Sequence, residues 1–144
     1  MAQPIPFDTQ QVFIGGQWRP SEGGHTLPLE NPSDGSLLAQ IARGGAADID
    51  AAVAAARAAL DGGEWGRLSA TERGRILGVM GRKVLEQVDA LAQLEALDVG
   101  KPLKQGRADA IALARYLEFY GGAADKVHGE TLPYQSGFTA LTWR

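Results

Sequence analysis

The chain has 144 residues, enough for one ordinary domain, and its 14 basic and 17 acidic side chains give a formal net charge of −3. Because the two signs are interspersed, without a basic stripe or polybasic cluster, the composition argues against nucleic-acid and membrane-surface partners. The absence of cysteine excludes disulfides, thiolate zinc sites and a cysteine nucleophile within these 144 residues.

The first ten residues, MAQPIPFDTQ, lack the basic region and apolar core of a secretory signal. No apolar run in the chain approaches the roughly 18 residues that span a bilayer. We therefore expect a cytoplasmic protein that makes no membrane contact, with residues 1–10 forming a flexible arm.

Short strands are predicted over the next thirty or so residues. In QVFIGGQWRP, residues 11–20, a Gly-Gly pair between β-forming residues predicts a two-residue hairpin. Residues 25–32 should be extended because Pro28 and Pro32 disfavour helical geometry in the residue before each. Residues 36–42, SLLAQIA, are predicted to form a further strand.

The hydrophobic period then changes to that of a helix. A first helix is predicted from residue 46 to the Gly62-Gly63 pair, with Asp48 and Asp50 in the first turn, where negative charge is favourable. A second run begins at a Ser69–Glu72 capping box and continues to about residue 99, with a break expected near residues 86–89.

The segment 107–127 is predicted to be helical and is apolar almost all round its middle, so it needs cover on more than one side. We expect an exposed apolar patch when these 144 residues are taken alone. Its predicted members are Ile111, Leu113, Tyr116, Leu117 and Phe119.

After a loop at HGETLP, residues 138–144 are predicted to form a strand that carries apolar groups on both faces. Such a strand is hazardous at a free edge, so we expect it to pair with later sequence or with another subunit. The order of short strands, three or four helices and one last strand leaves the fold incomplete.

No nucleophile constellation emerges from the sequence. The two histidines, His25 and His128, are far apart in presumed loops, and no zinc-site pattern accompanies them. The stretch EALDVGKPL, residues 95–103, is unusual because Asp98 lies at a helix C-terminus, where a carboxylate is disfavoured.

Two interpretations of Asp98 remain open. The carboxylate accepts a hydrogen bond from a nearby backbone N–H or pairs with Lys101, or it joins free carbonyl oxygens in an all-oxygen cradle for a hard cation.

Several pieces of the chain together resemble the N-terminal part of the NAD(P)-dependent aldehyde dehydrogenase superfamily. They include FIGGQWRP, the NP-x-x-G stretch at residues 31–35, DIDAAVAAA, the E-x-x-D-x-G-K-P stretch at residues 95–102, and YLEFYGGAADKVHGETLP. They occur in the family's order and at its usual spacing, from about residue 11 to the end.

The resemblance implies an α/β fold. Residues 11–128 would be the N-terminal hairpins and helices of the nucleotide-binding domain, and residues 129–144 would begin the β-arm used in oligomerisation. The intact protein would be a homodimer or homotetramer that oxidises an aldehyde to a carboxylic acid with NAD or NADP, through a cysteine thioester.

By the same resemblance, the catalytic residues all follow this segment, so the 144-residue chain alone is predicted to be inactive. Members of the family also hold a monovalent cation, which implies that Asp98 and the carbonyls of Leu29 and Glu30 bind potassium or sodium. Two competing hypotheses are a non-enzymatic helical scaffold or interaction module derived from that family, and an independent small metal- or ligand-binding domain.

Overall fold

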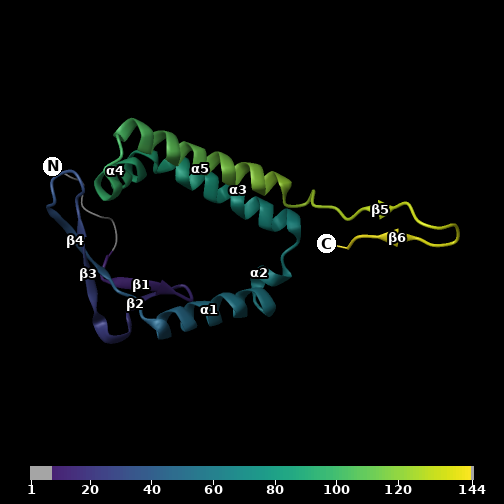
Figure 1. The fold of residues 1–144 in the computed structure, drawn as a ribbon, viewed down its shortest axis with the longest axis horizontal. Coiled ribbons are helices and arrows are strands. Elements are labelled where there is room, and N and C mark those ends of the chain that lie inside the picture. Colours follow the sequence, from purple (N-terminus) through teal and green to yellow (C-terminus); the bar gives the residue numbers. More distant parts are fainter. Residues whose placement is uncertain (1–7, 144) are drawn as a thin grey trace. The chain divides into compact units, whose positions relative to one another are not determined.

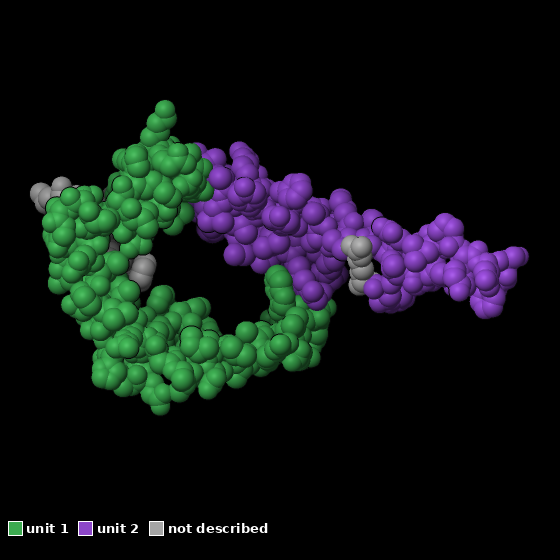
Figure 2. All heavy atoms as spheres, viewed as in Figure 1, with its two compact units in different colours: residues 1–67, 87–110 green, residues 68–86, 111–144 purple. Residues whose placement is uncertain are grey.

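The computed structural model describes residues 8–143. Two compact units make up the chain, and each consists of two separate stretches of sequence (Figure 2). Unit 1 comprises Met1–Arg67 and Gln87–Ala110, and unit 2 comprises Leu68–Glu86 and Ile111–Arg144.

The predicted hairpin opens unit 1. Strands β1, Gln11–Ile14, and β2, Gln17–Pro20, are antiparallel and place Ile14 opposite Gln17 (Figure 1). The two turn residues between them have positive φ values of 61° and 80°, as a type I′ turn requires, and glycine adopts these without steric cost. The Gly-Gly signal in the sequence is thus confirmed.

A second antiparallel pair follows a short 3₁₀ turn, Glu22–Gly24. Strand β3, Thr26–Glu30, pairs with β4, Leu37–Ala42, and the register shifts between Leu29 and Glu30. Thr9 is bonded to β4, because its Oγ1 donates to the Gln40 carbonyl at 2.6 Å and its own carbonyl accepts from Ala42 N at 2.8 Å. Residues 1–7 of the expected arm lie outside the described residues.

Helix α1, Ala46–Asp61, has the predicted bounds. The Asp48 carboxylate satisfies the start of the helix by accepting hydrogen bonds from Gly45 N at 2.9 Å and from Glu22 N at 3.0 Å. A four-residue helix, α2, Glu64–Arg67, follows and was not predicted.

The long helical run divides where the sequence indicated. Helix α3, Ala70–Glu86, lies in unit 2 and α4, Val88–Val99, in unit 1. The capping box at the start of α3 is confirmed, because Ser69 Oγ accepts from Glu72 N at 3.2 Å while Glu72 Oε2 accepts from Ser69 N at 2.8 Å.

Helix α5, Leu103–Ala123, begins earlier than residue 107, which the sequence analysis had taken as its start. Proline has no N–H to leave unsatisfied at a helix start, and the Pro102 carbonyl accepts from Gly106 N at 3.1 Å. Pro102 therefore caps the start of α5, whereas α4 has already ended at Val99. In unit 2, α3 and the second half of α5 lie side by side (Figure 1).

The end of the chain differs from the prediction. Of residues 138–143, only Ala140 and Leu141 form a strand, β6, and its partner is β5, Thr131–Leu132, within a stretch that was predicted to be a loop. The pairing stops at Leu132 because the next residue, Pro133, cannot donate to the ladder.

The core is thin. The buried apolar residues in the described part of the chain are Val88, Ala92, Ala110 and Ala114, and no large side chain there is fully buried. The apolar patch expected on α5 is confirmed for four of its five members, since Ile111, Leu113, Tyr116 and Phe119 are exposed and Leu117 is half-buried. None of the helices within residues 8–143 is both long and apolar enough to cross a membrane.

Candidate functional site

The candidate site predicted from the sequence lies in unit 1, at the C-terminal end of α4. This helix ends in the left-handed conformation at Gly100, with φ 69° and ψ 20°. Asp98 sits in the last turn, exposed to solvent. Negative charge is unfavourable at this end of a helix, so an unpaired Asp98 carboxylate is destabilising.

The end of α4 lies against the loop that follows β3. A Cβ atom added to Gly100 would be 3.1 Å from Pro32 Cγ and 3.9 Å from Ser33 Oγ. That loop is a closed turn, in which Asn31 N donates to the Ser36 carbonyl at 2.8 Å. The contact shows that the structure brings the helix end that carries Asp98 to the loop directly after Leu29 and Glu30.

Lys101 does not pair with Asp98. Its ammonium group lies 2.6 Å from Glu95 Oε1 in α4 and 2.7 Å from Asp109 Oδ2 in α5. The hydrogen bonds that Lys101 donates to Asp109 and Glu95 raise the pKa of Lys101, and the bond that Asp109 accepts from Lys101 lowers the pKa of Asp109. The ion pair between Asp98 and Lys101, which was one part of the first interpretation, is therefore not present.

The Asp98 carboxylate makes no hydrogen bond or ion pair with any residue in the range 8–143. The sequence could not show that Lys101 is engaged elsewhere, because its partners lie six residues before it and eight residues after it. Neither separation is a helical spacing.

The predicted ligands are all oxygens. They are the Asp98 carboxylate and the backbone carbonyls of Leu29 and Glu30 at the end of β3, where a shift in register interrupts the regular ladder. Hard cations prefer such donors. No group of three His, Cys, Asp or Glu side chains suited to a metal occurs among the described residues, so a cation here would depend mainly on carbonyls.

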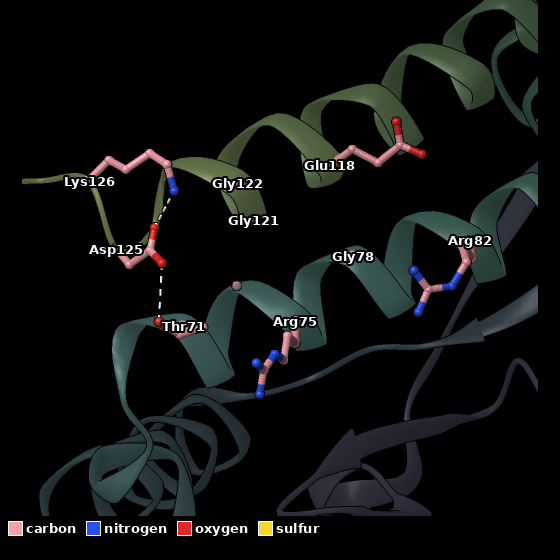
Figure 3. Close-up of a pocket in the computed structure, with 10 residues that line it drawn as sticks. Thr71, Arg75, Gly78, Arg82, Glu118, Gly121, Gly122, Asp125 and Lys126 are labelled. Carbon is pink, nitrogen blue, oxygen red and sulfur yellow. Dashed lines mark hydrogen bonds and ion pairs between the residues drawn. The ribbon is translucent and has the colours of Figure 1, made fainter.

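A hollow of about 290 Å³ lies in unit 2 between α3 and α5 (Figure 3). Its acidic residues already have partners: Asp125 accepts from Thr71 Oγ1 at 3.1 Å and pairs with Lys126, and Glu118 pairs with Arg115. The hydrogen bond from Lys126 is the main cause that lowers the pKa of Asp125. Of these three contacts, the one between Thr71 and Asp125 links α3 to the residues that follow α5, and the other two lie within or just after α5.

Comparison with known proteins gives a consistent result. The aldehyde dehydrogenase family matches residues 18–144. A mitochondrial aldehyde dehydrogenase of Mesocricetus auratus is 39% identical over 142 residues, which are 97% of this chain and 28% of that protein.

Solved structures agree. A provisionally assigned aldehyde dehydrogenase from Burkholderia cenocepacia superposes with a TM-score of 0.85 at 57% identity, over 92% of this chain and 27% of its own. An indole-3-acetaldehyde dehydrogenase from P. syringae, solved with NAD+ and IAA, gives a TM-score of 0.87 at 33% identity, over 97% of this chain and 28% of its own.

The chain thus spans little more than a quarter of the length of these relatives. The match nevertheless covers nearly all of the chain in both sequence and structure, and the strands and helices follow the order that the resemblance implied. The chain belongs to the aldehyde dehydrogenase family.

Proposed function

We propose that this chain is the N-terminal part of an NAD(P)-dependent aldehyde dehydrogenase, which oxidises an aldehyde to a carboxylic acid. The observation that carries the proposal is the match to the family over residues 18–144, at 39% identity to a mitochondrial relative. Relatives solved with NAD support a nicotinamide cofactor for the intact protein.

Within that enzyme, the role of these residues is structural. The chain has no cysteine to supply the thiol that the reaction requires. Residues 11–128 form part of the nucleotide-binding domain, and residues 129–144 begin an arm that joins subunits into a homodimer or homotetramer. The short β5–β6 hairpin and its exposed Tyr134, Phe138 and Trp143 support an arm of this kind.

The test is an activity assay on two proteins, the 144-residue chain and the full product of its reading frame. The full product should reduce NAD or NADP in the presence of an aldehyde, and the 144-residue chain should not. A reading frame that encodes no nucleotide-binding segment or catalytic cysteine would favour the scaffold hypothesis instead. Cell fractionation of the full product tests the proposed cytoplasmic location.

We also propose that Asp98, with the carbonyls of Leu29 and Glu30, binds potassium or sodium in the intact enzyme. Two observations support this site: the end of α4 lies against the loop after β3, and Asp98 has no other partner among the described residues. One carboxylate and a few neutral carbonyls suit a singly charged ion better than magnesium, which demands near-ideal octahedral geometry.

The cation site is tested by the thermal midpoint of the intact enzyme across a potassium titration, with ionic strength held constant by a large organic cation. Potassium should raise the midpoint of the wild type, and Asp98→Asn should abolish most of that rise while leaving the chemical step nearly unchanged. Identical responses of the two proteins would show that Asp98 is an ordinary helix-end residue.

A further inference from the structure

Lys101 is the basic residue nearest to Asp98 in the sequence, and two carboxylates bind its ammonium group. Its ammonium is bonded to Glu95 Oε1 at 2.6 Å and to Asp109 Oδ2 at 2.7 Å, and 30% of its side chain is exposed. Gln105 Nε2 donates to the other oxygen of Asp109 at 2.9 Å, which fixes that carboxylate in turn. We call Glu95, Lys101 and Asp109 the lysine clamp.

Without its partners, this ammonium would be drawn towards Asp98. Three residues of backbone separate the two positions, a span of at most about 11 Å, and the lysine side chain has a flexible four-carbon stem. The C-terminal end of α4 carries partial negative charge from its free carbonyls, and this charge attracts a nearby lysine. Asp98 adds a full negative charge at the same place.

The close packing of α4 and α5 holds the clamp in place. A Cβ atom added to Gly106 would be 3.0 Å from the Ala92 carbonyl oxygen, and Arg107 forms an ion pair with Asp89. These contacts keep Asp109 in α5 beside Glu95 in α4. The ammonium is therefore bound by two anions on closely packed helices, whereas Asp98 would offer it only one.

On the basis of the proposed cation site, we propose that the lysine clamp is a positioning device that keeps the Lys101 ammonium away from Asp98 and so leaves that carboxylate open to a monovalent cation. Lys101 is not a ligand of the ion. If the clamp is released, its ammonium becomes an internal competitor for the same carboxylate.

The experiment measures the potassium concentration that gives half of the maximal rise in thermal midpoint of the intact enzyme, at constant ionic strength. The variant Glu95→Gln/Asp109→Asn removes both charges of the clamp while preserving shape. Its half-saturating potassium concentration should rise about tenfold, the scale of an ordinary coupling between two binding events. Each single substitution keeps one partner of Lys101 and should give a smaller rise.

Adding Lys101→Met to the double variant removes the competitor, so the half-saturating concentration should return to within about twofold of the wild-type value. A matched control is Glu86→Gln, which frees Lys83 from an ion pair of 3.1 Å near the end of α3. That variant should bind potassium as the wild type does.

The outcomes separate the two proposals. In one outcome, potassium raises the thermal midpoint of the wild type through Asp98, but release of the clamp leaves the half-saturating potassium concentration unchanged. The clamp proposal is then overturned and the cation site stands. If binding weakens and Lys101→Met does not restore it, the loss comes from loosened helices, and competition by the ammonium is overturned. A wild type with no response to potassium overturns both.

Discussion

Gly74 in α3 and Gly121 in α5 approach so closely that a Cβ atom on Gly74 would lie 2.3 Å from the Gly121 carbonyl oxygen. In the reverse direction, a Cβ on Gly121 would lie 2.7 Å from the Gly74 carbonyl oxygen. Both contacts are to backbone atoms, which cannot move aside as a flexible side chain could. The separation of α3 and α5 in unit 2 is therefore set by two missing side chains.

Gly74→Ala should destabilise the protein by about 1–3 kcal/mol, because the helices must separate to admit the methyl group. The control is Gly122→Ala, in the last turns of α5, where an added Cβ meets no heavy atom within 4 Å. That variant should be neutral or about 0.5–1 kcal/mol more stable, since alanine favours a helix over glycine. Urea unfolding of the two variants checks this, and equal effects would contradict the close approach.

Asp48 should make stability depend on acid pH. The hydrogen bond from Gly45 N is the main cause that lowers the pKa of this carboxyl, with further contributions from Glu22 N and the charge of Arg19. Because the pKa is lower in the folded state, the stabilisation is present above the unfolded pKa of about 3.9 and is lost as pH falls through the folded pKa.

Asp48→Asn should therefore lose stability near neutral pH and show a flatter decline below about pH 4. The measurement is the urea midpoint from pH 2 to pH 7. Asp50→Asn is the control, because Asp50 is exposed on the same helix and its substitution should cost less stability at neutral pH than Asp48→Asn does. An unchanged profile for Asp48→Asn would show that the hydrogen bonds at the start of α1 do not favour the charged form.

The capping box of α3 predicts a loss of about 1 kcal/mol for Ser69→Ala, because Glu72 N then lacks its acceptor. Ser136→Ala, in the exposed turn between β5 and β6, should change the free energy of unfolding by less than about 0.5 kcal/mol. Denaturant midpoints of the two variants measure the difference. Equal values would show that the Ser69 hydroxyl adds no stability to the start of α3.

Phe119 offers a contrast between the 144-residue chain and the intact enzyme. Its side chain is 67% exposed here, so Phe119→Ala should change the stability of this chain by less than about 0.5 kcal/mol. If later sequence covers α5, the same substitution in the intact enzyme should cost about 3 kcal/mol or more. A small effect in both proteins would show that this face of α5 stays open to solvent.

The local signals in the sequence were sufficient for much of the fold. The Gly-Gly hairpin, the Ser69–Glu72 box and the break before α4 each depend on residues within a few positions of one another, and all three are confirmed. The short helix α2 was missed because four residues carry no detectable period. The β5–β6 pairing was missed because it joins residues 131 and 141 across a loop.

In the candidate site, too, a local feature could be predicted from the sequence and a long-range contact could not. Asp98 was singled out because its charge opposes the polarity of its own helix, which is a local conflict that a sequence displays. The engagement of Lys101 with Asp109 depends on how α4 and α5 pack through Ala92 and Gly106, and no spacing rule gives that. The sequence therefore identified the unusual carboxylate of Asp98, but it did not show that Lys101 binds Glu95 and Asp109 instead.

The alternation of the two units along the chain has a consequence for synthesis. Unit 1 takes residues from both sides of α3, and α5 passes from unit 1 to unit 2 after Ala110. During translation, unit 1 cannot fold completely until Ala110 has been synthesised. At that point α3 is already complete, but the second half of α5, against which it packs, has not yet been made. The face of α3 that carries Gly74 and Gly81 therefore stays uncovered until the second half of α5 is finished.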